Sequence, residues 1–149
     1  MIMISVETRE ANVVLLVRIF LGVLFFLQGY DKVFRMGVSK VVETIHTPLA
    51  DKGVPNTFSI IGAYFTSYVE LICGALLIVG FLKYYCLYLL GVDLLFAAFA
   101  FGLVEPIWDM KHIFPRLALL VFLLMVPSQW DIISIDRLWS FIKFIKTIF

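Results

Sequence analysis

The sequence has little charge and few of the residues that soluble enzymes use for chemistry. Charged residues make up only 15% of its 149 residues, against about a quarter in soluble domains. It has two histidines and two cysteines, and Cys73 and Cys86 lie in apolar runs without the spacing of a redox or metal motif. There is no phosphate loop, no HExxH and no nucleophile near a histidine. A self-contained catalytic motif is therefore absent, and the cysteines are expected to be core or lipid-facing filler.

The sequence also lacks a concentration of positive charge. The formal net charge is +1, and lysines and arginines are scattered through the polar connections and chain ends. Proteins that bind nucleic acid gather basic residues into a patch or stripe. This distribution excludes nucleic acid as a partner.

Long hydrophobic runs dominate instead. The sequence is 62% hydrophobic, with a mean hydropathy of +1.03, and a membrane-spanning helix needs about 20 mostly apolar residues. Four such runs and their connections occupy the whole chain. We predict one all-α transmembrane domain over residues 1–149, a four-helix bundle in the lipid bilayer. The expected spans are residues 11–30, 57–82, 84–104 and 113–133.

Three shorter features of the sequence add detail to the predicted four-helix arrangement. Between the first two runs, Val38, Val41, Val42 and Ile45 recur at helical spacing, which predicts an amphipathic interfacial helix in the first loop. The fourth run is short, and spanning would require the helix to continue past Pro127 with a kink. Residues 136–149 combine aromatic and basic side chains and are expected to form an amphipathic tail on the membrane surface.

Three ionisable residues fall inside the apolar runs. Arg18, Glu70 and Asp93 cost several kcal/mol each to place in a bilayer, so such residues usually face the bundle interior and often mark function. Counted at about 1.5 Å per residue from one membrane face, they share one slab. Helical spacing also puts small residues, Gly22 and Gly74 among them, on the same faces as the charges, which permits close helix packing. We predict an intramembrane polar site.

This polar site has two interpretations at the level of the sequence. Arg18 and one carboxylate could simply pair and lock the helices together. Alternatively, two acids facing one base would leave one carboxyl, which we expect to be Glu70, holding a proton. A protonated carboxyl there could pass protons or donate a hydrogen bond to a quinone.

A second polar group flanks the opposite ends of the runs. It is either an ordinary wet rim with aromatic anchors or the mouth through which a ligand enters. A lone His112 is not a metal site, so no metal is expected. The predicted rim residues are Gln28, Asp31, Lys32, Glu105, Trp108 and His112.

Several of these residues have a spacing that is also found in a known protein family. In the first run, Arg18, Gly22, Gly29 and Lys32 have the spacing seen in the opening helix of the DoxX family of small four-helix membrane proteins. The chain resembles that family further on as well. The matching segments are Lys52-Gly53-Val54-Pro55, Glu70 with Gly74 and Gly80, and Ser134-Ile135-Asp136.

The resemblance implies a multi-pass protein of the bacterial cytoplasmic membrane, with a protein partner or a second copy of itself. It also implies a membrane subunit of a redox complex linked to quinone or to thiol and sulfur chemistry. No covalently bound cofactor is expected, and quinone is the candidate ligand. The alternative is a non-enzymatic scaffold or chaperone that binds another membrane or exported protein, and the sequence leaves open whether the chain is part of an enzyme.

Overall fold

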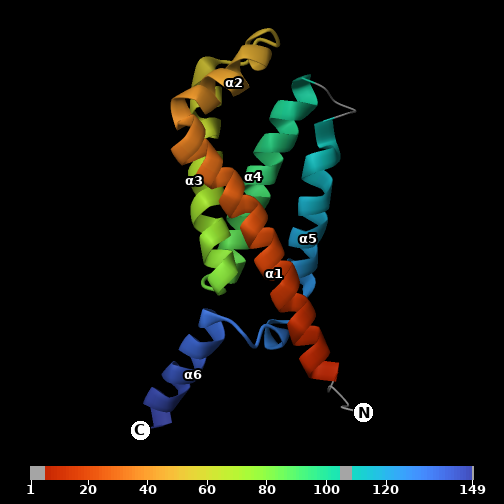
Figure 1. The fold of residues 1–149 in the computed structure, drawn as a ribbon, viewed down its shortest axis with the longest axis vertical. Coiled ribbons are helices and arrows are strands. Elements are labelled where there is room, and N and C mark those ends of the chain that lie inside the picture. The colour runs from red at the N-terminus through yellow and green to blue at the C-terminus, as the bar shows by residue number, and fades with distance from the viewer. Residues whose placement is uncertain (1–5, 105–108, 149) are drawn as a thin grey trace.

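The computed structural model describes residues 6–104 and 109–148, and the regular elements in these ranges are all helices. Figure 1 shows them as a bundle of long helices with a short helix at one end and a projecting helix at the other. The elements are α1 (Val6–Tyr30), which continues as a π-helical segment (Asp31–Met36), α2 (Val38–Ala50), α3 (Asn56–Val79), α4 (Lys83–Val104), α5 (Ile113–Met125) and α6 (Ile135–Ile148), with 3₁₀ turns at Asp109–His112 and Ser128–Trp130.

The bundle has the membrane architecture that the apolar runs predict. Three helical stretches, Thr8–Met36, Asn56–Val79 and Lys83–Val104, are long and apolar enough to cross a bilayer. The fourth helix, α5, is apolar but has only 13 residues, roughly 20 Å at the usual rise. The four-helix prediction is confirmed, with a short fourth member.

The distribution of side chains is that of a protein whose solvent is lipid. Large apolar side chains face outward, such as Leu16 at 70% and Leu95 at 69% exposure, whereas Arg18, Glu70 and Asp93 are at most 3% exposed. A soluble protein arranges these classes the other way round. The charged residues in the apolar runs therefore face the interior of the bundle, as the sequence predicts.

Close packing of α1 against α3 depends on glycine. A Cβ atom built on Gly29 would collide with the backbone nitrogen of Leu71, and one on Gly74 would collide with that of Phe26. Only glycine lets the two backbones approach this closely, which is a common device between membrane helices. This contact fixes which residues of α1 lie beside which residues of α3.

Helix α3 ends in a tight turn that returns the chain as α4. Gly80 has φ +72°, and the backbone N–H groups of Gly80 and Phe81 donate to the carbonyls of Leu77 and Leu76 at 3.2 and 3.0 Å. This is a Schellman motif, in which glycine supplies the left-handed residue. The two helices consequently form an antiparallel hairpin.

The predicted fourth span, residues 113–133, is wrong beyond Met125. Val126 and Pro127 have extended ψ values of 132° and 137°, so the chain leaves the helix instead of kinking within it. Two features redirect the chain. Residues 128–130 form a 3₁₀ turn, and the Asp131 side chain is buried against Arg18 and Lys83. The membrane portion of α5 therefore ends at the proline.

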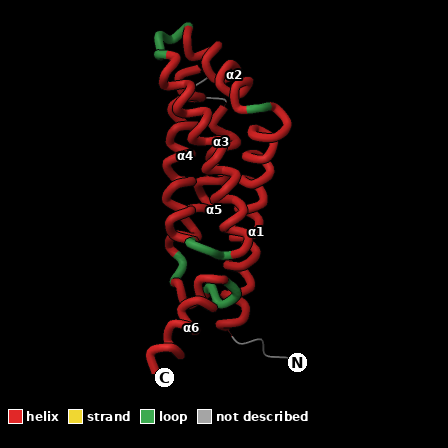
Figure 2. Tube along the Cα trace, turned by 90° about the vertical axis from the view of Figure 1, so that its left-hand side faces the viewer, coloured by secondary structure: helices red, strands yellow, loops and turns green. Residues whose placement is uncertain are grey.

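The two predicted amphipathic segments both form helices. Helix α2 packs on α3 with Val38, Val41 and Leu49 buried, so the helix expected in the first loop is confirmed. Helix α6 lies at the other end, where it points away from the bundle with exposed apolar side chains. Figure 2, turned by 90°, shows the start of α1 and the end of α6 at this same end of the molecule.

Candidate functional site

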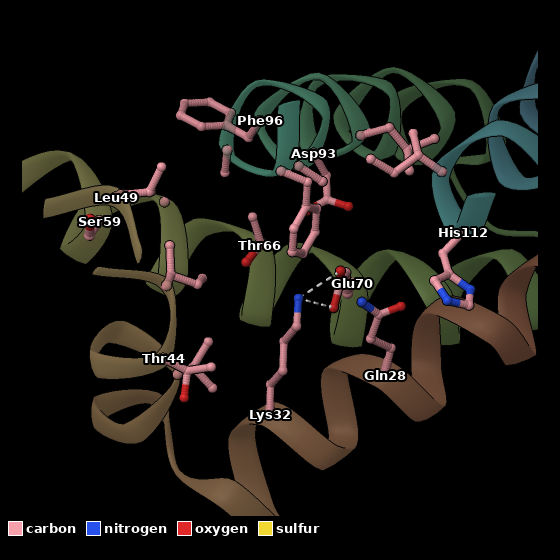
Figure 3. Close-up of a pocket in the computed structure, with 18 of the residues that line it drawn as sticks. Gln28, Lys32, Thr44, Leu49, Ser59, Thr66, Glu70, Asp93, Phe96 and His112 are labelled. Atoms are coloured by element: carbon pink, nitrogen blue, oxygen red, sulfur yellow. Dashed lines mark hydrogen bonds and ion pairs between the residues drawn. The ribbon is translucent and has the colours of Figure 1, made fainter. Parts of the chain in front are cut away.

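A cavity of about 410 Å³ opens between α2 and the interior of the bundle. Its walls are mostly apolar and come from α1, α2, α3, α4 and α5. Figure 3 shows side chains from these helices converging on it. The residues used below are Gln28, Lys32, Leu49, Ser59, Thr66, Glu70, Asp93, Ala97, His112 and Arg116, all of which line the cavity.

An ion pair between α1 and α3 forms part of the cavity floor. Lys32 Nζ donates a hydrogen bond to Glu70 Oε1 at 2.8 Å and lies 2.8 Å from Oε2, as the dashed lines in Figure 3 indicate. The Glu70 side chain is 4% exposed and that of Lys32 is 18% exposed. Lys32 follows Gly29 by one turn, and Gly29 packs on the backbone of Glu70 and Leu71. The glycine contact therefore brings the two charges together.

The π-helical segment carries Lys32 to this position. It spans Asp31–Met36 and ends at Gly37, which has φ +81°. Such segments are uncommon and recur at functional sites, because they change the direction of side chains relative to an α-helix. The helix of α1 thus continues beyond the expected end at Tyr30, and its last turns belong to the cavity.

Asp93 is the carboxyl in the cavity that lacks a cation. It is 1% exposed, and its Oδ1 atom has no hydrogen-bond partner in the part of the chain that the structure describes. Figure 3 shows the side chain pointing from α4 toward the cavity. The structure pairs Glu70 with Lys32, so Asp93 is the cavity carboxyl without a paired cation among the described residues. The expectation that Glu70 holds a proton stays a prediction.

Donors and acceptors from the predicted rim complete the site. Gln28 and His112 line the cavity together with Arg116, whose guanidinium lies 5.8 Å from the centre of the Phe25 ring. The Oε1 atom of Gln28 is buried without a hydrogen-bond partner among the described residues. The cavity therefore presents cationic groups and unpaired polar atoms to whatever enters it.

Of the remaining rim residues, the structure describes Asp31, which lies away from the site. Asp31 pairs with Arg35 at 3.2 Å on the exposed side of the helix, with its side chain 45% exposed. Glu105 and Trp108 lie outside the described residues. The ligand mouth predicted from the sequence is thus represented by Gln28, Lys32 and His112.

Helix α2 covers the cavity from the loop side. Leu49 on α2 is 1% exposed and lines the cavity beside Ser59 of α3. His46 Nδ1 lies 3.2 Å from the Ser59 hydroxyl, a polar link between the cover and the bundle. Gly37 precedes α2 and Gly53 follows it, and both have positive φ. The position of α2 therefore depends on two glycine turns.

Arg18 belongs to a different polar cluster at the α6 end. Its Nη1 atom lies 3.1 Å from Asp131 Oδ1, and its Nη2 atom donates to the carbonyl of Ile133 at 2.6 Å. Lys83 Nζ lies 3.1 Å from the other Asp131 oxygen. The side chains of Arg18, Lys83 and Asp131 are at most 7% exposed. This cluster joins α1 and α4 to the segment after α5.

Three hydrogen bonds hold the start of α6 on the α3–α4 turn beside this cluster. Asp136 accepts hydrogen bonds from the backbone N–H groups of Leu82 and Lys83 at 2.9 and 3.0 Å, and its own N–H donates to Gly80 at 3.0 Å. Ser134 caps α6 by accepting from the N–H of Arg137 at 3.2 Å. The segment that replaces the expected fourth span is therefore fastened to the turn between α3 and α4.

The predicted slab of Arg18, Glu70 and Asp93 is consequently wrong. A Cβ on Gly80 would touch the guanidinium of Arg18, and Gly80 follows Glu70 by ten residues, roughly 15 Å along α3. The error comes from measuring depth from the start of the apolar run at residue 11, since α1 begins at Val6 and the glycine contact sets its offset from α3. The structure brings Glu70 and Asp93 together and leaves Arg18 out.

Sequence reasoning also missed the partners of these charges. Lys32 was assigned to the rim, although it follows Gly29 by three positions and so shares the face that meets α3. Asp131 was counted inside a span, although the neighbouring Pro127 and Ser128 are a signal for a turn. If residues 127–131 form a connection instead of a span, Asp131 is a carboxylate available to pair with the buried Arg18.

One protein family matches most of the membrane-spanning part of the chain. The family model described as DoxX matches residues 13–103, more than half of the chain. The chain belongs to the DoxX family. A search of curated proteins and a search of solved structures found no match.

The DoxX match covers most of α1 to α4, four of the five helices that line the cavity. It includes Lys32, Glu70 and Asp93, and it ends within α4. The family resemblance of the sequence therefore divides into two structural parts: Gly29, Lys32 and Glu70 build the cavity floor, whereas Arg18, Gly80 and the Ser134–Asp136 segment build the buried cluster at the other end.

Proposed function

We propose that this DoxX protein is the membrane subunit of a redox complex and that its cavity binds the head group of a membrane quinone. The observation that carries the proposal is the combination of an apolar cavity of about 410 Å³ with a buried carboxyl and an ion pair at its floor. Pockets for small ligands have this size and this arrangement of a few polar groups in an apolar wall.

The polar groups match the chemistry of a quinone ring. A quinone has two carbonyl oxygens that accept hydrogen bonds, and Lys32 and Arg116 are obligate donors on the cavity wall. Gln28 adds an amide that can donate as well as accept. The apolar walls of α3 and α4, including Phe58 and Phe96 with ring centres 5.6 Å apart, suit the ring and its tail.

The acidic residues give the chain a role in moving protons. A bound quinone would supply two-electron chemistry, in which reduction also requires two protons. Asp93 is a buried carboxyl beside the Lys32–Glu70 pair and is the group in the cavity suited to hold a proton, because no cation is paired with it among the described residues. We place the electron donor on a partner protein at the membrane surface.

Ligand titration of the purified protein in nanodiscs tests this proposal. Ala97 lines the cavity, so Ala97→Phe should fill it and weaken binding of a short-chain quinone about tenfold or more, a change of at least about 1.4 kcal/mol. Leu95→Phe is the matched control, because Leu95 is 69% exposed on the neighbouring lipid-facing side of α4. Equal binding by both variants would overturn the assignment of this cavity.

The competing function is a non-enzymatic scaffold that recognises another protein. The exposed apolar side chains of α6, such as Leu138 and Phe141 at 65% and 64% exposure, favour it, because they cover no other part of the described structure. A scaffold would retain its partner when Ala97→Phe fills the cavity, and protein extracted gently from membranes would carry that partner without quinone. Co-purifying quinone that disappears in the variant supports the redox subunit instead.

A further inference from the structure

The two cysteines of the chain meet inside the bundle. Cys73 on α3 is 3% exposed and Cys86 on α4 is 2% exposed, and both belong to the same core cluster. Their side chains are close enough to interact electrostatically, and both are free thiols. The sequence expectation of core filler describes their burial correctly but does not account for their juxtaposition.

The register of the α3–α4 hairpin explains why they meet. Cys73 precedes the turn residue Gly80 by seven positions and Cys86 follows it by six, so an antiparallel hairpin places them at one level. The ring contact between Phe65 and Phe96, at 5.6 Å, shows the same register further along the two helices. The juxtaposition therefore follows from the hairpin and not from one side-chain rotamer.

Facing positions of packed helices suit a disulfide. Axes of packed helices are about 8–10 Å apart and the Cα radius is about 2.3 Å, which puts directly facing Cα atoms at roughly 3.4–5.4 Å. Disulfides join Cα atoms roughly 4.4–6.8 Å apart. An S–S bond between Cys73 and Cys86 thus requires no rearrangement of the hairpin.

The dithiol lies between the two polar clusters of the protein. Glu70, at the cavity floor, precedes Cys73 by three residues, and Lys83, in the Arg18–Asp131 cluster, precedes Cys86 by three. Each separation is one helical turn or slightly less, roughly 4.5 Å along the axis. The thiols therefore lie about one helical turn beyond Glu70, outside the residues that line the cavity.

We propose that Cys73 and Cys86 form a redox-active dithiol that a membrane quinone oxidises to an intramembrane disulfide. The step rests on the proposed function, since the oxidant is the quinone class assigned to the cavity. Two S–H bonds break and one S–S bond forms; the two electrons and two protons released convert the quinone to hydroquinone. Membrane quinones also take electrons from protein thiols in the bacterial periplasm, so the reaction class is chemically sound.

Intact-mass spectrometry on the full chain tests this dithiol. The purified protein in nanodiscs is reduced, freed of reductant under anaerobic conditions and incubated with a short-chain quinone. The wild type should lose the mass of two hydrogen atoms, and its two thiols should no longer react with maleimide after denaturation. Hydroquinone should form in a one-to-one ratio to protein, whereas Cys73→Ser and Cys86→Ser should each keep one reactive thiol and form none.

Two additional measurements separate the possible failures. Quinone binding is titrated in the same nanodiscs, and diamide replaces the quinone as a thiol oxidant in a parallel sample. Normal quinone binding with both thiols unchanged overturns the dithiol proposal and leaves the proposed function standing, whether or not diamide forms the bond. Absence of quinone binding overturns the proposed function, and this inference with it. Intermolecular disulfides would also overturn it, because the geometry predicts a bond within one chain.

Discussion

Two buried carboxyls that look alike in the sequence differ in their surroundings. Glu70 has Lys32 at 2.8 Å, whereas Asp93 has no hydrogen-bond partner for Oδ1 among the residues that the structure describes. A buried charge without compensation is far more costly than a paired one. The two residues should therefore respond in opposite ways to neutral replacements.

Lys32→Met is expected to destabilise the protein strongly. It would leave Glu70 buried without its cation, and loss of one member of a buried pair costs about 3–5 kcal/mol. Asp93→Asn should be close to neutral, because it removes an acid that has no paired base. Thermal unfolding of the purified variants in detergent measures both effects. Recovery of stability in the double variant Lys32→Met, Glu70→Gln is the control, and a Lys32→Met variant as stable as the wild type would show that the pair is unimportant.

Gly80→Ala is expected to disrupt the buried cluster at the α6 end. The added Cβ would collide with the Arg18 guanidinium and with Ser134, at a residue whose φ of +72° already disfavours a side chain. Gly102→Ala on α4 is the matched control, because a Cβ there meets nothing within 4 Å. Melting temperatures should fall for the first variant and hold or rise for the second; the same change in both would argue against the cluster.

At the scale of elements, apolar periodicity within each segment determines where the helices form. Contacts between particular residues determine how far one helix is displaced along another. The apolar runs predict α1, α3 and α4 well, and Val38 to Ile45 predict α2, because periodicity acts within one segment. The relative offset of α1 and α3 depends on the contact of Gly29 with Leu71, which no single run reveals. For that reason Glu70 and Asp93 were correctly placed in one interior site, whereas Arg18 was assigned to it wrongly.

The start of α6 gives a prediction at this scale. Asp136→Ala removes the acceptor for the backbone N–H groups of Leu82 and Lys83, so α6 should separate from the α3–α4 turn. Hydrogen exchange over residues 135–148 should then accelerate. Ser140→Ala is the control, since that hydroxyl bonds only within α6, to the Asp136 carbonyl. Unchanged exchange in Asp136→Ala would mean that other contacts hold the helix.

The molecule as a whole has two polar regions in an apolar shell. One, formed by Arg18, Lys83 and Asp131, is an ionic cluster with its charges paired to one another, and it fastens helix ends together. The other encloses space and has unpaired acceptors on Gln28 and Asp93. Structural stability is thus concentrated at the α6 end and ligand chemistry at the α2 end, with the cysteine pair between them.

Photo-crosslinking with an azido-quinone in native membranes tests the central claim most directly. Labelled peptides are mapped by mass spectrometry, with and without excess unlabelled quinone. The account predicts labels on the cavity residues Ser59, Gly62 and Thr66 of α3 and Asp93, Phe96 and Ala97 of α4. Excess quinone should suppress these labels, and Ala97→Phe should abolish them. Labels confined to lipid-facing residues such as Leu95, unaffected by competitor or by the variant, would contradict the account.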